Sequence, residues 1–159
     1  MSARRIDYLD DPNAPEPNSV VPSANVVVVN GEGLILLIRR TDNGNLALPG
    51  GGMDLGESIT QAAVREVKEE TGVDVEITGL VGIYTNPGHL IEYTSDGEVR
   101  QEFSVVFTAR PIGGSPRTSS ESSEVVWMDP ADVAGLQMHP SMRQRIEHFA
   151  QGRTQPYLG

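Results

Sequence analysis

The chain has 159 residues, with 12 Lys and Arg against 22 Asp and Glu, so its formal net charge is −10 at pH 7. This length suits one domain. The acidic balance argues against a nucleic-acid polymer or an anionic membrane surface as a partner, because both attract Lys and Arg. The chain has no cysteine, which excludes disulfides, thiolate metal sites and cysteine nucleophiles. An anionic substrate would need another neutralising partner, such as a divalent metal.

The first 22 residues contain four prolines and lack the apolar run of a signal peptide, and no run elsewhere is long enough to span a membrane. We expect an extended N-terminal arm over residues 1–22, a folded domain over residues 23–152 and a C-terminal tail over residues 153–159. The lack of a targeting segment predicts a cytoplasmic protein.

Strands are predicted from apolar, β-branched runs bounded by Gly, Asn and Asp. The first two runs, Ala24–Val29 and Leu34–Arg39, flank the turn signal Asn30-Gly31-Glu32-Gly33 and are predicted to form a hairpin. Further strands are predicted at Val75–Thr78, Leu80–Thr85, His89–Thr94, Val99–Arg110 and Glu124–Met128.

Two helices are predicted between and after these strands. The first runs from Ser58 to about Thr71 and ends at Gly72, because glycine adopts the left-handed conformation that terminates many helices. The second covers Pro140–Gln151, where apolar residues fall on one stripe. Strands and two helices in mixed order predict an α/β (α+β) sandwich.

The first predicted helix carries carboxylates on its apolar side. At about 100° per residue, Glu66 and Glu70 fall among apolar residues such as Ala63 and Val67, and Glu69 lies on the shoulder of the same side. A solvated acidic face would lie opposite these apolar residues. Clustered carboxylates that lose hydration repel one another unless a cation neutralises them, and Mg²⁺ prefers carboxylate oxygens. The spacing therefore predicts a divalent metal site.

The segment around this helix resembles the Nudix box, G-x5-E-x7-R-E-U-x-E-E-x-G-U, in which U is aliphatic. All nine defined positions match, at Gly51, Glu57, Arg65, Glu66, Val67, Glu69, Glu70, Gly72 and Val73. The resemblance covers about residues 24–149, includes a Leu-Pro-Gly-Gly segment before the box, and is to MutT-like and ADP-ribose pyrophosphatase-like members. One departure is Leu46, where many members have tryptophan.

The resemblance implies an α/β/α sandwich with a mixed central β-sheet. It implies hydrolysis of the pyrophosphate bond in a nucleoside diphosphate linked to another moiety, with Mg²⁺ or Mn²⁺ as cofactor. Glu66, Glu70 and the carbonyl of Gly51 would hold the metal, and Glu69 would be either a further ligand or the base that activates water. Arg65 would orient a box carboxylate through a charge-assisted hydrogen bond.

Supporting and substrate-binding residues are expected on either side of the box. Gly52 and Glu57 are assigned a supporting role, Glu57 acting either on the metals through water or as a cap of its loop. Arg39 and Arg40 end a predicted strand, so only one of them can face a site, where it would clamp a pyrophosphate. A charged strand end explains the two arginines equally well.

The general base is the least determined of these assignments. Besides Glu69, the Ser-rich stretch 115–123 and its exit offer Glu121 and Glu124. We prefer Glu69, and we prefer Glu121 to Glu124 because Glu124 abuts a strand. Trp127 is expected to pack in the core. The three histidines are too scattered along the chain for a metal triad, and we expect His89, His139 and His148 to be structural or surface residues.

The substrate is predicted only as a class of small nucleotide. ADP-ribose hydrolases of the family often have a proline shortly after the box, and Pro87 slightly favours ADP-ribose or a related derivative. An ordinary or damaged nucleoside triphosphate is the alternative substrate. A second alternative is a non-catalytic nucleotide sensor on the same fold. The sequence leaves open a homodimer.

Overall fold

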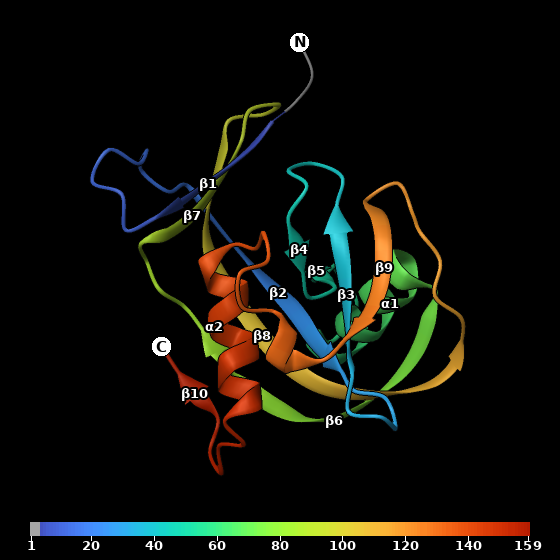
Figure 1. The fold of residues 1–159 in the computed structure, drawn as a ribbon. Helices are drawn as coiled ribbons and strands as arrows, with labels where there is room; N and C mark the ends of the chain where they lie inside the picture. Colours follow the sequence, from blue (N-terminus) through green and yellow to red (C-terminus); the bar gives the residue numbers. More distant parts are fainter. Residues whose placement is uncertain (1–3) are drawn as a thin grey trace.

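The computed structural model describes residues 4–159 of the chain. Its strands, drawn in Figure 1, are β1 (Arg5–Leu9), β2 (Ser19–Val28), β3 (Ile35–Arg40), β4 (Leu46–Ala47), β5 (Gly50–Gly52), β6 (Val73–Tyr84), β7 (His89–Tyr93), β8 (Glu98–Gly114), β9 (Ser122–Met128) and β10 (Tyr157–Leu158). Its helices are α1 (Ile59–Thr71), the short 3-10 helix η1 (Pro130–Asp132) and α2 (Pro140–Ala150). No helix among the described residues is long and apolar enough to cross a membrane.

The described strands form two sheets. In the larger sheet the order is β1-β7-β8-β2-β5, while β6 pairs with β8 and β10 pairs with β6. This sheet is mixed, because β2 runs parallel to β8 whereas β6 and β7 run antiparallel to it. The smaller sheet has the order β4-β3-β9 and carries the end of β3 to the edge of the site described below (Figure 1).

The two sheets lie between the two helices. Val26 and Val28 of β2 belong to a hydrophobic cluster that includes Val67 of α1, whereas Val27 belongs to a second cluster that includes Ile146 of α2. Successive side chains of a strand point to opposite faces, so β2 is buried on both faces, each covered by one helix. The predicted α/β/α sandwich with a mixed central β-sheet is confirmed.

Helix α1 begins and ends where the sequence predicts. The Ser58 side chain accepts a hydrogen bond from the Gln61 backbone, and the Gln61 side chain accepts one from the Ser58 backbone, which completes a capping box. Gly72 ends the helix with φ of 79°, a left-handed conformation that glycine adopts without steric cost. The cap and the glycine fix the register that turns Glu66 and Glu70 inward.

The hairpin predicted around Asn30–Gly33 is wrong. The turn itself forms, because the side chain of Asn30 accepts hydrogen bonds from the backbone of Glu32 and Leu34. However, β2 pairs with β8 and β5, whereas β3 pairs with β4 and β9 in the other sheet, and a single bridge joins Val29 to Ile35. Both edges of β2 are occupied by strands from distant parts of the chain, which a local turn signal does not reveal.

Both expected terminal segments contribute strands to the larger sheet. Within the expected arm, β1 pairs antiparallel with β7 and β2 already begins at Ser19; residues 1–3 lie outside the described residues. In the expected tail, β10 pairs parallel with β6. The strands predicted at 75–78 and 80–85 are one continuous strand, β6. Its pairing with β8 changes register at bulges or irregularities along its length.

Candidate active site

The buried side of α1 presents two carboxylates to strand β5. Glu70 is 4% exposed and the side chain of Glu66 is 12% exposed, whereas the side chain of Glu69 is 58% exposed. Gly51 allows this close approach, because a Cβ at that position would lie 2.6 Å from the carboxyl carbon of Glu66. The backbone N–H of Gly50 points to Glu70 at 3.4 Å. The inward orientation expected for Glu66 and Glu70 is therefore observed.

The charges of this pair are not balanced by the protein alone. Burial, with a further contribution from the negative charge of Glu66, raises the pKa of Glu70 to about 9. Burial also raises the pKa of Glu66, although the adjacent Arg65 acts in the opposite direction. A bound cation would favour the ionised form of both groups. The donor set of carboxylate oxygens beside a glycine backbone fits a hard divalent cation.

A third carboxylate comes from the connection between β8 and β9. Oxygen atoms of Glu66, Glu70 and Glu121 lie within 4.8 Å of one another. The backbone of Glu121 is fixed, because its carbonyl accepts from Thr41 N–H at 3.1 Å and the hydroxyl of Ser122 donates to the carbonyl of Glu70 at 2.6 Å. Within residues 4–159, Glu69 does not belong to this group. Glu121, which lies beside the buried pair, is thus on a loop that is fixed by hydrogen bonds.

Arg65 connects the box residues that surround the pair. Its guanidinium donates two hydrogen bonds to Glu57 at 2.9 and 2.6 Å, one to Glu66 at 2.9 Å and one to the carbonyl of Gly52 at 3.0 Å. It also reaches Glu69 at 3.2 Å. Hydrogen bonds from Arg65 lower the pKa of Glu57 to about 2. Glu57 and Gly52 therefore hold Arg65, and Arg65 holds Glu66.

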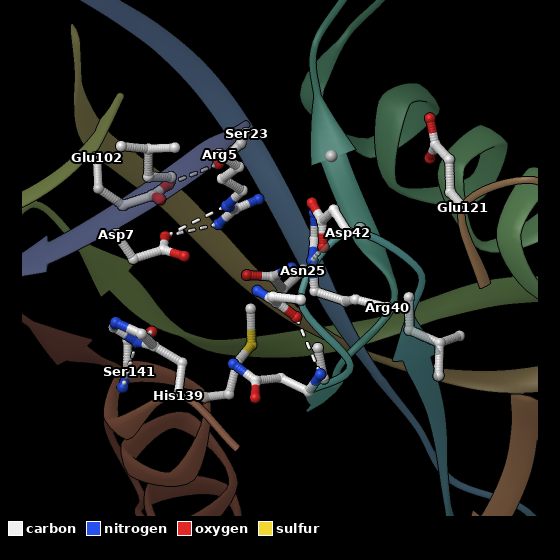
Figure 2. Close-up of a pocket in the computed structure, with 18 of the residues that line it drawn as sticks. Arg5, Asp7, Ser23, Asn25, Arg40, Asp42, Glu102, Glu121, His139 and Ser141 are labelled. Atoms are coloured by element: carbon white, nitrogen blue, oxygen red, sulfur yellow. Dashed lines mark hydrogen bonds and ion pairs between the residues drawn. The ribbon is translucent and has the colours of Figure 1, made fainter. Parts of the chain in front are cut away.

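The carboxylates open onto a cavity of about 380 Å³ between the larger sheet, the end of β3 and the start of α2 (Figure 2). Arg40 lines this cavity, and its guanidinium donates to both oxygens of Asp42 at 2.9 and 2.7 Å. Arg39 points away, pairing with Glu124 at 2.8 Å. Because successive side chains of a strand alternate, Arg40 is the arginine that faces the cavity. The ion pair with Arg39 also holds Glu124 away from it.

The aromatic residues divide between core and cavity. Trp127 packs against the hydrophobic cluster that contains Val67. Tyr84 is buried in the cluster on the side of α2. Tyr93 lines the cavity, and the guanidinium of Arg100 lies 5.0 Å from its ring centre. The expectation that Trp127 packs in the core is confirmed.

The other end of the cavity brings together residues that the sequence did not predict to lie near one another. Asp7 of β1, His89 of β7 and His139 at the start of α2 bring potential ligand atoms within 4.8 Å of one another. The three histidines do not form a triad, because His148 lies outside this group and contacts Tyr84. Pairing of β1 with β7 and packing of α2 nevertheless bring His89 and His139 together with Asp7, a contact that was not expected from the sequence. Sequence spacing carries no signal for this contact.

Arg145 of α2 is the most buried charge in this part of the cavity. It is 2% exposed and donates a hydrogen bond to the side chain of Asn25, and its Nε has no hydrogen-bond partner within the described part of the chain. No carboxylate among residues 4–159 forms an ion pair with Arg145. Arg5 and Arg100 also line the cavity, so this end carries several cationic side chains opposite the glutamates.

Comparison with known proteins assigns the chain to a family. A family model described as the NUDIX domain matches residues 20–149. The chain is 41% identical over 128 residues to a MutT-like protein of Streptomyces ambofaciens, covering 80% of this chain and 76% of that protein. It is 34% identical over 110 residues to an ADP-ribose pyrophosphatase of Methanocaldococcus jannaschii, covering 64% of this chain and 58% of that protein.

A solved structure shares the fold. The MutT protein from Methanosarcina mazei Go1 superposes with a TM-score of 0.68 and 25% identity, covering 89% of this chain and all (100%) of that one. The chain therefore belongs to the Nudix family. It is a Nudix hydrolase, an enzyme of the class that acts on phosphorus anhydrides, and enzymes of this family generally need divalent metal ions.

Proposed function

We propose that the cavity hydrolyses the pyrophosphate bond of a nucleoside diphosphate linked to another moiety, with Mg²⁺ as the natural metal and Mn²⁺ as a substitute. The observation that carries this proposal is the buried, mutually repelling pair Glu66 and Glu70, with Glu121 beside it. All nine defined positions of the Nudix box are present in the sequence, and the pair supplies two of them. A nucleotide that enters the cavity would meet carboxylates at one end and arginines at the other.

Glu66, Glu70 and the carbonyl of Gly51 would hold the metal. A bound divalent ion supplies charge neutralisation on the phosphate oxygens and lowers the pKa of water. Arg65 keeps Glu66 oriented, and the fixed hydrogen bonds to Glu57 keep Arg65 in place. Arg40 lines the cavity near the pair and would bind a non-bridging phosphate oxygen beside its hydrogen bonds to Asp42, whereas Arg39 does not line the cavity and pairs with Glu124.

Two residues compete for the role of general base. Glu121 is supported by its proximity to Glu66 and Glu70 and by the backbone hydrogen bonds that hold its loop. Glu69 is more exposed and hydrogen-bonded to Arg65. A base must reach the attacking water within hydrogen-bond distance, directly or through one more water. The geometry supports Glu121 over Glu69, the reverse of the preference drawn from the sequence.

ADP-ribose or a related derivative is the substrate we favour. The likeness to an ADP-ribose pyrophosphatase and the position of Pro87 support it. The cavity also offers Tyr93 for stacking and Arg100 and Arg145 for polar groups remote from the diphosphate. The net charge of −10 favours small nucleotides over polymers. We therefore prefer a substrate in which a diphosphate bridges a nucleoside and another moiety to a nucleoside triphosphate.

A panel of nucleotides tests the proposal. Purified protein is incubated with ADP-ribose, other nucleoside diphosphate derivatives, and ordinary and oxidised nucleoside triphosphates, each with Mg²⁺ or Mn²⁺, and the products are separated by chromatography. We expect AMP and ribose 5-phosphate from ADP-ribose, because the site addresses phosphate oxygens and offers no carboxylate pair for a glycosidic bond. Release of free adenine or ribose as the first product would refute this chemistry.

The same panel separates an enzyme from a nucleotide sensor. A sensor would bind ADP-ribose, seen as a shift in melting temperature, and would release no product in either metal. Glu70→Gln is the matched inactive control, because it removes one charge from the buried pair without changing its shape. Turnover by the wild type that is lost in this variant supports catalysis at Glu66 and Glu70, whereas equal turnover in both would place the reaction elsewhere.

A further inference from the structure

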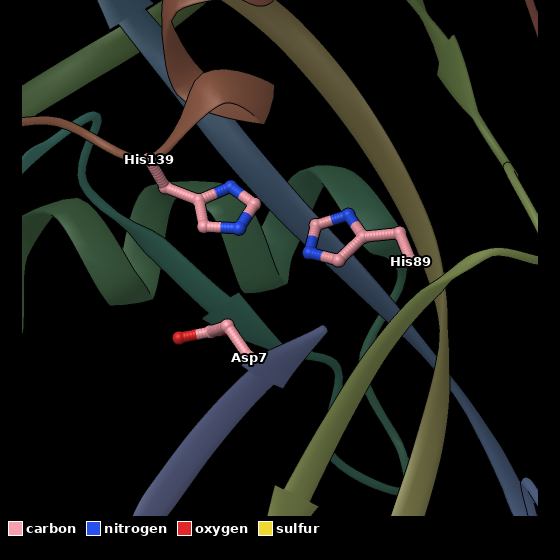
Figure 3. A group of neighbouring side chains, drawn as sticks. All are labelled: Asp7, His89 and His139. Atoms are coloured by element: carbon pink, nitrogen blue, oxygen red, sulfur yellow. The ribbon is translucent and has the colours of Figure 1, made fainter. Parts of the chain in front are cut away.

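A second group of potential metal ligands lies across the cavity from the glutamates. Figure 3 shows the imidazoles of His89 and His139 side by side with Asp7 of β1 next to them, and potential ligand atoms of the three residues lie within 4.8 Å of one another. In Figure 2, Asp7 and His139 lie on one side of the cavity and Glu121 lies on the other. The members come from β1, β7 and the residue that caps α2, so the group is formed by tertiary packing.

Each member has a ligand atom available. Nδ1 of His139 lies 2.7 Å from the hydroxyl of Ser141 and accepts a hydrogen bond from the backbone N–H of Ser141 at 3.1 Å. Metal binding through Nε2 would require the tautomer in which Nδ1 donates to the Ser141 hydroxyl and the backbone hydrogen bond is given up. Arg5 donates to Oδ1 of Asp7 at 3.1 Å, which leaves Oδ2 for another partner. His89 is 6% exposed, and burial favours its neutral form, the form that binds metals.

We propose that Asp7, His89 and His139 bind a divalent transition-metal ion such as Zn²⁺, at a site separate from the Nudix box. Two imidazole nitrogens and one carboxylate oxygen are a donor set typical of such ions. Ser141 and Arg5 are the outer partners that orient His139 and Asp7. Because Asp7, His89 and His139 all line the cavity, water or a group of the substrate would complete the coordination.

The surrounding charges select against a hard cation. Arg5 and Arg145 face the group with positive charge, and Glu102 faces it with negative charge, together with Asp7 itself. These formal charges cancel, so the group does not attract cations by net charge as the glutamate pair does. Affinity must come from coordination by imidazole nitrogen, which favours Zn²⁺, Ni²⁺ or Co²⁺ over Mg²⁺. The two ends of the cavity would therefore hold different metals.

A bound ion would also connect β1 to the rest of the fold. Among the described strands, β1 pairs only with β7, through Arg5–Leu9 and His89–Tyr93. Coordination would add a link from Asp7 to β7 and to α2. We expect Zn²⁺ to slow tryptic cleavage at Arg5 in the wild type, and to leave the rate unchanged in His139→Gln. This readout is independent of catalysis.

The binding test uses the full chain carrying Glu70→Gln, so that turnover plays no part and the glutamate end binds metal less well. The protein is stripped of metal with a chelator, and Co²⁺ is titrated in the presence of excess Mg²⁺ and followed by visible absorption. We expect one equivalent of Co²⁺ with a visible band, displaced by Zn²⁺. Absence of a saturable band would overturn the proposal.

Matched variants in the same Glu70→Gln background locate the ion. We expect Asp7→Asn and His89→Gln each to weaken Co²⁺ binding by about tenfold or more, since loss of an outer-shell partner alone costs ~10–100-fold. His148→Gln is the control, because His148 lies on α2 outside the group and contacts Tyr84. Melting curves check folding, and the two substitutions lie on different strands.

Two results would contradict the site. Equal Co²⁺ affinity in the parent, Asp7→Asn and His89→Gln would show that these residues are not ligands. Loss of binding in His148→Gln as great as in His89→Gln would place the ion elsewhere. Neither result bears on the hydrolase proposal, which is decided by turnover with Mg²⁺ in protein that retains Glu70.

Discussion

The two ends of the cavity are built in different ways. The acidic end is formed largely by a continuous segment, in which Gly51, Arg65, Glu66 and Glu70 lie within one strand, one turn and one helix. The opposite end is assembled from β1, β7, β8 and α2. Local chemistry defines the first end, whereas the topology of the sheet creates the second. Mutations at the two ends should therefore separate metal chemistry from substrate and ion recognition.

The largest effect is expected at the centre of the acidic end. Glu70→Gln should lower kcat with Mg²⁺ by about 10³-fold or more, because Lewis-acid stabilisation is worth several kcal/mol and each 1.36 kcal/mol is tenfold. Near neutral pH the melting temperature of the metal-free protein should hold or rise, because burial and Glu66 raise the pKa of Glu70 to about 9 and a neutral glutamine needs no proton in order to be buried there. Glu147→Gln, on an exposed face of α2, is the control. Near-wild-type turnover of Glu70→Gln at limiting Mg²⁺ would show that Glu70 does not bind the metal.

The next effect separates the two candidate bases. Loss of a general base costs ~10²–10⁴-fold in kcat with little change in KM, because the base acts mainly in the transition state. We expect this result for Glu121→Gln and a much smaller loss for Glu69→Gln. If Glu121→Gln keeps at least about a third of wild-type kcat while Glu69→Gln does not, the base is Glu69, and Glu121 serves metal binding or closure over the substrate.

Substitution of Arg145 tests whether the opposite end of the cavity binds the substrate. Arg145→Met should raise KM for ADP-ribose about tenfold or more with little change in kcat, since a hydrogen bond to a charged group is worth ~1.5–3 kcal/mol. Stability should hold, because replacing a buried, unpaired charge by an apolar side chain is often neutral or favourable. Asn25 keeps a hydrogen bond from the hydroxyl of Ser104 at 3.3 Å. A fall in kcat with unchanged KM would contradict this role.

Neighbouring glycines test how closely the metal residues must pack. In Gly51→Ala the new Cβ would lie 2.6 Å from the carboxyl carbon of Glu66, so that carboxylate must move. The Mg²⁺ concentration for half-maximal rate should rise about tenfold. In Gly52→Ala the Cβ would meet only Val21, at an ordinary 3.6 Å, and the Mg²⁺ dependence should stay close to wild type. An equal rise in the Mg²⁺ requirement of both variants would show that the close approach of Gly51 to Glu66 is not needed for metal binding.

The sequence predicts the acidic end because its determinants are local. Ser58 and Gly72 set the ends of α1, and helical periodicity then turns Glu66 and Glu70 inward. The same reasoning does not rank Glu121 against Glu69. That order depends on the hydrogen bonds of Glu121 to Thr41 and of Ser122 to Glu70, which join distant segments.

The opposite end could not be predicted because its contacts are long-range. A strand in the expected N-terminal arm has no local signal for its partner, so nothing in the sequence connects Asp7 with His89. The failed hairpin around Asn30 has the same cause, since β8 and β5 occupy both edges of β2. Strand pairing is decided by burial over the whole sheet, and only its pattern of alternation is visible in the sequence.

The smallest effect concerns the support of the acidic end and depends on pH. Arg65 lowers the pKa of Glu57 from 4.5 to about 2 in the folded protein. A depressed pKa stabilises the fold above the unfolded value, and this contribution disappears as the pH falls from about 4.5 to about 2. Urea unfolding should therefore show Glu57→Gln less stable than the wild type near neutral pH, with a difference that shrinks through this window. The pH dependence of this difference should shrink markedly in an Arg65→Gln background, because Arg65 is the largest cause of the lowered pKa and the backbone N–H of Asp54 is the next; an unchanged pH dependence there would assign the lowered pKa to another group.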